Sequence, residues 1–227
     1  MLGKTKIILC SYNKGGVGKT TLAVHITGVL LEQRKGQVLL VDCDPRPDSW
    51  RFYKGKRPQG QELRSKINSR LDILWNPPQD KGEKFKPIKK ADLQAYDYIV
   101  IDTDSPPEDT VIMINNNLPD IILIPINKSQ RHSLDEIPDF LELLKQVKSI
   151  KNSSPNVDYS PKIIIVPLGV SENEILRLVP DADCKIPKAM KNIQDQMVDA
   201  LGEKRYIWKY QDCEDSLEYF SSLLEMM

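Results

Sequence analysis

A glycine-rich segment constrains this chain more than any other feature of its sequence. Residues 13–21 read Asn-Lys-Gly-Gly-Val-Gly-Lys-Thr-Thr, after an apolar, β-branched run at Lys6–Ser11 and before a helical apolar pattern that starts at Lys19. Glycines let the backbone curl with several N–H groups pointing inward, a conformation that a Cβ atom would block. The N-terminus of the following helix adds its dipole. This order of strand, glycine loop and helix predicts a phosphate-binding loop.

The side chains of the loop predict that ATP binds there with Mg²⁺. Lys19 is expected to reach the β- and γ-phosphates, and the Thr20 hydroxyl to bind Mg²⁺, a small cation that takes few protein oxygens. Asn13 stands where the usual loop pattern has its first glycine, and Lys14 follows it. Because Lys14 is one more cation than a single nucleotide requires, it either stabilises the charge of γ-phosphoryl transfer or is a solvated surface lysine. The predicted nucleotide contacts are Lys14, Gly15, Gly16, Val17, Gly18, Lys19, Thr20 and Thr21.

Three aspartates follow apolar runs that are predicted to be strands. Asp42 and Asp44 come after residues 38–41, and Asp102 comes after residues 98–101. Parallel sheets bind ligands beyond the carboxyl ends of their strands. Asp42 and Asp102 are therefore predicted to support Mg²⁺, and Asp44 to orient the attacking water. For Asp42 or Asp44 the alternative is a helix N-cap or a turn before a proline.

Apolar runs rich in β-branched residues alternate with longer amphipathic segments along the whole chain. This pattern predicts an α/β, doubly wound, mostly parallel sheet flanked by helices, the P-loop NTPase fold, in a single domain over residues 1–227. The expected strands are Lys6–Ser11, Gln37–Asp42, Leu71–Trp75, Tyr98–Asp102, Ile121–Ile126, Lys162–Pro167 and Cys184–Ile186. The expected helices are Lys19–Gln33, Glu108–Asn117, Ser133–Lys148, Ser171–Val179, Lys188–Leu201 and Cys213–Glu225.

Composition limits the partners and the location of the chain. Lys+Arg and Asp+Glu number 32 each among 227 residues, so no global positive field attracts nucleic acid or anionic lipid. The four cysteines include no C-x-x-C pair and are expected to be reduced, buried thiols. The chain has no apolar stretch of membrane length and no signal-peptide pattern at its N-terminus, so a cytoplasmic location is expected.

One segment, Arg46–Lys90, departs from this charge balance. It contains thirteen Lys or Arg residues against five acidic ones, a net charge of +8. With Trp50, Phe52 and Tyr53 interleaved among its cations, it is a candidate for contact with nucleic-acid phosphates and bases. The alternative is a solvated loop face.

Together these motifs resemble the ParA/MinD family of deviant Walker A P-loop ATPases, most of all the small ParA-type partition ATPases. Residues 14–21 resemble the family's loop signature, and residues 42–45 its second acidic motif. Residues 102–107 resemble its Walker B turn, with one extra residue, so that Asp104 either enters the site or caps the next helix. Residues 185–188 resemble its Ile-Pro-Arg/Lys element.

The resemblance implies a homodimer that ATP closes, in which Lys14 contacts the phosphates of the other subunit's nucleotide. It implies slow ATP hydrolysis that a ParB-like adaptor protein stimulates and that resets the dimer. The implied site residues are Lys14, Lys19 and Asp44 for catalysis, Thr20, Asp42 and Asp102 for Mg²⁺, and Pro187 beside the adenine.

The resemblance also bears on what the dimer holds. Small partition relatives bind nonspecific DNA through basic residues of the dimer. Membrane-positioning relatives end in a basic amphipathic helix, whereas residues 203–227 here have a net charge of −3, so no membrane partner is expected. The expected function is ATP-dependent segregation or positioning of DNA. The alternatives are positioning of a protein cargo, and a P-loop synthetase or kinase for a small molecule. Iron–sulfur and zinc-bridged relatives need cysteine patterns that this chain lacks.

Overall fold

The computed structural model describes residues 4–60, 62–77, 85–103, 107–127 and 132–227. Seven strands form one sheet in the order β3-β4-β2-β5-β1-β6-β7, all parallel except β3, which is antiparallel to β4. The strands are β1 Lys6–Cys10, β2 Val38–Asp42, β3 Arg64–Lys66, β4 Leu71–Trp75, β5 Tyr98–Asp102, β6 Ile121–Asn127 and β7 Lys162–Leu168. The helices are α1 Lys19–Gln33, α2 Asp48–Lys54, α3 Lys90–Ala95, α4 Pro107–Asn117, α5 Ile137–Asn152, α6 Glu172–Leu178, α7 Gln194–Glu203 and α8 Asp215–Met226, with a 3₁₀ turn, η2, at Ile207–Lys209.

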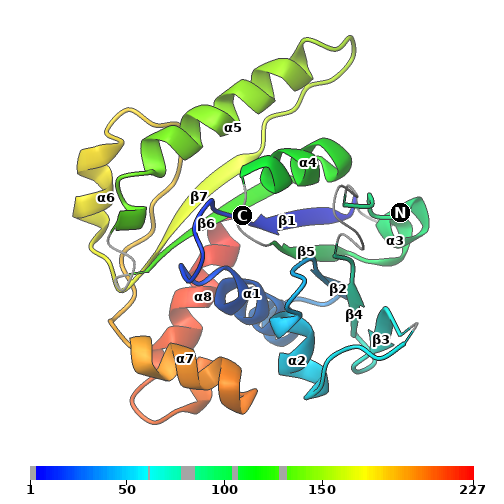
Figure 1. Ribbon diagram of the computed structural model, residues 1–227. Helices are drawn as coiled ribbons and strands as arrows, with labels where there is room; N and C mark the ends of the chain where they lie inside the picture. The colour runs from blue at the N-terminus through cyan, green and yellow to red at the C-terminus, as the bar shows by residue number, and fades with distance from the viewer. Residues whose placement is uncertain (1–3, 61, 78–84, 104–106, 128–131) are drawn as a thin grey trace.

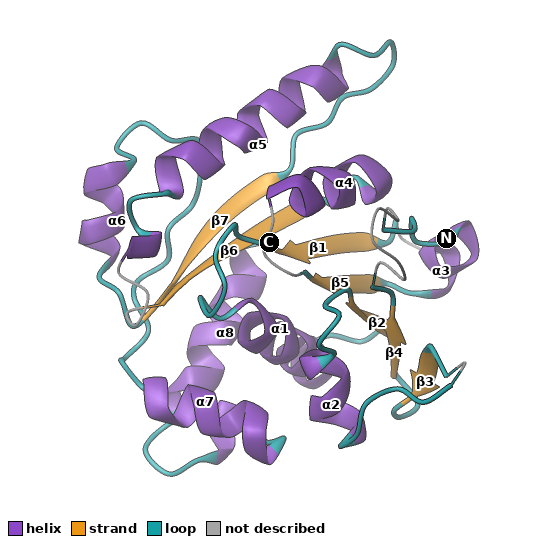
Figure 2. Ribbon diagram, in the orientation of Figure 1, coloured by secondary structure: helices purple, strands orange, loops and turns teal. Residues whose placement is uncertain are grey.

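Helices cover both faces of the sheet (Figures 1 and 2). On one face α1 packs between α8 and α2, and on the other face lie α4 and α5. The strands alternate between the two hydrophobic cores: in β1, Ile8 and Cys10 join the α1 core, and Ile7 and Leu9 join the α4–α5 core. Both faces of the sheet are therefore buried. The continuous apolar runs in the sequence predicted this, because strands of a parallel sheet are apolar on both faces. The predicted fold class is confirmed.

The register of the central strands brings their carboxyl ends together. In the β2–β5 pair Asp42 lies opposite Asp102, and in the β1–β5 pair Cys10 lies opposite Asp102. The glycine loop leaves β1 at this same edge of the sheet. The fold thus places the loop and the aspartates of β2 and β5 beside one another, as ligand binding at the carboxyl end of a parallel sheet requires.

Several predicted elements were wrong. The segment Cys184–Ile186 makes a single bridge from Lys185 to Ile164 in place of a strand. The helix predicted from Lys188 begins at Gln194, and the one predicted from Ser133 begins at Ile137. The prediction also missed the short elements α2, β3, α3 and η2. All four cysteines are free; three are buried and Cys184 is partly exposed.

The basic segment is less available than its charge suggested. Trp50 and Phe52 are buried in the core, and Tyr53 packs against it, so these rings form no exposed stacking surface. Arg70 donates to the carbonyl oxygens of Leu31 at 2.8 Å and Gly36 at 3.0 Å, where it caps the C-terminus of α1. The three aromatic rings and Arg70 therefore stabilise the fold through packing and hydrogen bonds.

Candidate functional site

The glycine loop forms one wall of a cleft at the carboxyl end of the sheet. Gly16 and Gly18 have φ angles of 74° and 103°, in the left-handed region that glycine adopts most readily. A Cβ atom on Gly18 would also lie 2.8 Å from Cδ1 of Leu168, so only glycine fits where α1 begins. The cleft has a volume of about 460 Å³. Its lining includes Gly15, Gly16, Gly18, Lys19, Thr20, Thr21, Asp44, Arg46, Thr103 and Asn127.

Both lysines of the loop have partners within the chain. The Nζ of Lys19 donates to the carbonyl oxygen of Lys14 at 2.6 Å. The Nζ of Lys14 forms an ion pair with Glu136, which precedes α5. The loop therefore holds two ammonium groups, one buried in the cleft and one half-exposed at its rim.

Asp102 is buried at the end of β5, and one oxygen of its side chain is not used in a hydrogen bond among the described residues. Its Oδ2 accepts a hydrogen bond from the buried hydroxyl of Ser49 at 2.7 Å, and the Thr20 side chain also hydrogen-bonds to this carboxyl group. Its Oδ1 is buried and has no hydrogen-bond partner among the described residues. Burial raises the pKa of Asp102, while the bonds from Ser49 and Thr20 and the charge of Lys19 lower it. An orphaned carboxylate oxygen beside a threonine hydroxyl fits Mg²⁺, which prefers such oxygens.

Asp42 has a different environment from Asp102. Its Oδ2 accepts from the backbone N–H of Trp50 at 2.8 Å, and its Oδ1 from that of Asp44 at 3.1 Å. Burial and the charge of Asp102 raise the pKa of Asp42. Because Trp50 lies in the first turn of α2, Asp42 anchors the start of this helix to the end of β2. Its support of Mg²⁺ stays a prediction.

Asp44 lies in the cleft, on the turn between β2 and α2. It is half-buried, its Oδ1 accepts from the N–H of Arg46 at 2.6 Å, and its carbonyl oxygen accepts from the indole N–H of Trp75 at 3.0 Å. These two hydrogen bonds hold the turn in place, and the Asp44 carboxylate lies in the cleft that Lys19 also lines. This placement suits a group that orients water, and the role stays a prediction.

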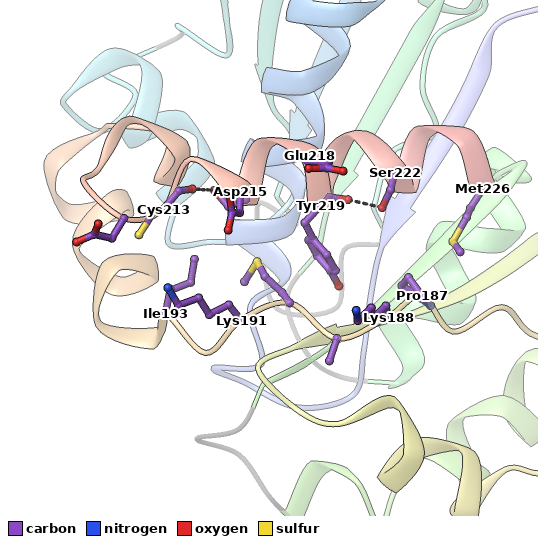
Figure 3. A pocket seen from close by; sticks show the side chains of 14 residues that line it. Pro187, Lys188, Lys191, Ile193, Cys213, Asp215, Glu218, Tyr219, Ser222 and Met226 are labelled. Carbon is purple, nitrogen blue, oxygen red and sulfur yellow. Dashed lines mark hydrogen bonds between the residues drawn. The ribbon is translucent and has the colours of Figure 1, made fainter.

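The structure does not bring Pro187 into this cleft. Pro187 lines a separate pocket between the segment that precedes α7 and helix α8, toward which Tyr219 points (Figure 3). Its contact with adenine stays a prediction. Asp104 lies outside the described residues.

Sequence reasoning missed several residues of the site. Ser49 holds Asp102 from the first turn of α2, a helix that was not predicted. Arg46 lines the cleft, although its charge was counted only in the basic segment. Met197, Val198 and Leu201 of α7 form an apolar part of the wall. For Ser49, its position five residues after Asp44 of the D-x-D motif was the one signal in the sequence.

Comparison with known proteins decides the family. Residues 8–224 match the model of the CobQ/CobB/MinD/ParA nucleotide binding domain. The chain belongs to this family. The part described here contains no helix that is long and apolar enough to span a membrane.

Two curated relatives of this CobQ/CobB/MinD/ParA domain match part of the chain. The chain is 31% identical over 99 residues to a nitrogenase iron protein of Methanococcus voltae, covering 44% of this chain and 31% of that one. It is 30% identical over 122 residues to the maintenance of carboxysome distribution protein A of Gloeobacter kilaueensis, covering 48% and 54%. The matches thus span about a third and about half of these relatives' lengths.

Solved structures share the fold of this family member over nearly its whole length. Apo McdA from Cyanothece superposes with a TM-score of 0.70 at 18% identity, covering 97% of this chain and 99% of the other. A plasmid partition protein of Borrelia burgdorferi bound to AMPPNP superposes with a TM-score of 0.64 at 21% identity, covering 98% of each chain.

Proposed function

We propose that this chain is an ATP-hydrolysing switch of the ParA type, with one ATPase domain that ATP converts from monomer to homodimer. The observation that carries the proposal is the pair of lysines on one glycine loop, which follows β1 in the same sheet as β2 and β5, the strands that end at Asp42 and Asp102. One lysine suffices to bind the phosphates of a single nucleotide. The second, Lys14, half-exposed at the rim, is available to a nucleotide in another copy of the chain once it leaves Glu136.

Each residue of the cleft then has a role. The N–H groups of Gly15, Gly16 and Gly18 bind the phosphates, and Lys19 leaves the carbonyl of Lys14 to neutralise them. Thr20 and Asp102 hold Mg²⁺, which neutralises charge on the β- and γ-phosphates when it is bound. Asp44 orients the attacking water.

The cargo we propose is DNA, held nonspecifically by the dimer and moved with an adaptor protein that stimulates hydrolysis. Exposed cations in the basic segment support this, among them Arg51, Lys56, Arg57, Lys66, Lys86, Lys89 and Lys90. Each phosphate contact makes the slope of log affinity against log salt concentration more negative by about 0.9. The likeness to a plasmid partition protein agrees with this cargo.

A second candidate is the positioning of a protein cargo. One observation favours it: the similarity to a carboxysome distribution protein. DNA remains the track on which such a switch moves in this alternative, and the adaptor connects it to the protein cargo.

Duplex binding in three nucleotide states tests the proposal. We expect the wild type to bind a nonspecific duplex with ATP, and not with ADP or without nucleotide, with affinity that falls as salt rises. Lys56→Glu with Arg57→Glu should weaken binding and leave ATP hydrolysis intact. Glu142→Gln, a surface change on α5, is the control. Absence of duplex binding in every state would contradict the DNA function, and robust hydrolysis without any macromolecule would then favour a small-molecule enzyme.

A further inference from the structure

Arg46 lines the same cleft as the glycine loop. It is exposed, two residues after Asp44, on the turn between β2 and α2. Its backbone N–H donates to Oδ1 of Asp44 at 2.6 Å, so the turn fixes the position of the arginine backbone. Two segments therefore bring cations to the cleft, the glycine loop with Lys19 and the turn with Arg46.

Three neighbouring arginines have partners within the chain. Arg51 pairs with Asp48 at 2.9 Å, Arg64 pairs with Asp92 at 2.7 Å, and Arg70 donates to the carbonyl oxygens at the end of α1. Arg46 forms no ion pair within the described ranges. An arginine without an ion pair that lines the same cleft as the glycine loop is available to a ligand.

We propose that Arg46 is a catalytic residue whose guanidinium binds the γ-phosphate of ATP, a role that rests on the function proposed above. In hydrolysis the oxygen of a water bonds to the γ-phosphorus as the bond to the β,γ-bridging oxygen breaks. The electron pair of that bond remains on ADP, and the proton of the water leaves with inorganic phosphate or to solvent. Negative charge moves between the phosphate oxygens during this step.

A guanidinium is suited to this charge. It stays protonated at all physiological pH values, and its planar fork donates two parallel hydrogen bonds to phosphate oxygens. Arg46 would act from within the same chain, next to Asp44, so the residue that orients the water and the residue that stabilises the phosphate share one turn. Lys14 would contribute from a second copy.

Nucleotide affinities and turnover of Arg46→Ala test the role, with Arg177→Ala as the matched control. Arg177, on α6, is also exposed and does not line the cleft. We expect Arg46→Ala to lower kcat by about 100-fold or more, as loss of a charge-stabilising group does elsewhere. Its affinity for ADP should stay within about twofold of wild type, while affinity for ADP with aluminium fluoride, which mimics the transferred phosphate, should fall by about the same factor as kcat. Arg46→Lys should recover part of both losses.

The outcomes separate this proposal from the function on which it rests. If Arg46→Ala keeps wild-type kcat and wild-type affinity for ADP with aluminium fluoride, Arg46 does not bind the γ-phosphate. If it instead weakens duplex binding as much as Arg57→Ala does, Arg46 is a contact to DNA, and the proposal is wrong. If the wild type binds ATP without hydrolysing it, the proposed function fails. Arg46 is then judged by affinity alone: the variant should lose ATP binding and keep ADP binding, and equal losses would overturn the role.

Discussion

The side-chain ammonium of Lys14 is paired with the carboxylate of Glu136, the residue before helix α5. The same loop residue accepts a hydrogen bond from Lys19 on its carbonyl oxygen. The ammonium group of Lys14 therefore has a carboxylate partner within its own chain. In the function proposed above, Lys14 contacts the nucleotide of a second copy, and the ion pair with Glu136 would compete with that contact.

Replacing Glu136 by Gln should therefore favour the ATP-bound dimer. A partly exposed ion pair contributes about 0.2–1 kcal/mol, so its loss should lower the dimer dissociation constant up to about fivefold for each lysine released. Sedimentation of the ATP-bound protein over a concentration series measures this. Asp139→Asn, the same charge change one turn along α5, should have little effect. A dimer of Glu136→Gln that is no tighter than wild type would show that the pair does not restrain Lys14.

Ser49 should be required to position Asp102 for Mg²⁺. Ser49→Ala removes the hydrogen bond to Oδ2 and leaves Thr20 as the remaining donor to this buried carboxyl group, which should cost about 1–3 kcal/mol of stability and raise the Mg²⁺ concentration needed for tight ATP binding. A Mg²⁺ titration of ATP affinity measures the second effect. The control is Ser216, another buried serine, whose hydroxyl donates to the carbonyl oxygen of Cys213 outside the cleft. Ser216→Ala should lower stability and leave the Mg²⁺ dependence unchanged. Identical Mg²⁺ dependence in the two variants would contradict the role of Ser49.

His25 should make the folded state less stable in acid. The N–H of Ile207 donates to its Nε2 at 3.0 Å, and its Nδ1 donates to the carbonyl oxygen of Thr21 at 2.6 Å, which requires the neutral ring. Burial lowers the pKa of His25 from 6.5 to about 4. Between these values the unfolded chain binds more protons than the folded one, so stability is complete above pH 6.5 and falls as the pH drops toward 4, by up to about 3 kcal/mol.

Urea unfolding of wild type and His25→Gln from pH 7.5 to 4.5 tests this sign. The variant should be less stable at neutral pH, and it should lose less stability in acid because glutamine does not titrate. The buried carboxylates are the same in both proteins, so their contributions cancel in the comparison. His132→Gln, at an exposed position, should follow the wild type. A pH dependence that is equal in wild type and His25→Gln would count against this account.

At Gly28, α1 packs closely against the aromatic rings of the C-terminal segment. A Cβ atom there would lie 2.6 Å from Cε1 of Tyr206 and 2.9 Å from Cη2 of Trp208, whose rings stack at 4.7 Å. Gly28→Ala should cost about 1–3 kcal/mol because the two rings must move. Gly202→Ala on α7 meets no atom within 4 Å and should be neutral or stabilising. Thermal unfolding of both variants measures the contrast, which would be absent if the segment shifted freely.

The sequence predicted the parts of this fold that repeat a strong local pattern. The β-branched runs and the glycine loop located the central strands and α1, because burial on both faces leaves a continuous apolar signal. Short elements carried no such signal: β3 is three residues long, and α2 is an amphipathic turn within a charged segment. The sequence showed the charges of this segment, but it did not show that Trp50 and Phe52 are buried in the core.

The site followed the same division. Motifs predicted a shared site for Lys19, Thr20 and Asp102, whose roles stay predictions, and the register of β2 against β5 brings Asp42 and Asp102 together. The contacts of Lys14 with Glu136 and of Ser49 with Asp102 join residues that are distant in the sequence. Only the folded chain reveals them, because no local pattern marks a partner across the cleft.

Sedimentation velocity of wild type and Lys14→Ala with ATP and Mg²⁺, with ADP and without nucleotide tests the central claim most directly. The account predicts that the wild type is a dimer only in the state with ATP and Mg²⁺. It predicts that the Lys14→Ala protein binds ATP through Lys19 and stays monomeric in all three states. A wild type with the same mass in all three states, or a Lys14→Ala protein that dimerises as well as the wild type, would contradict it.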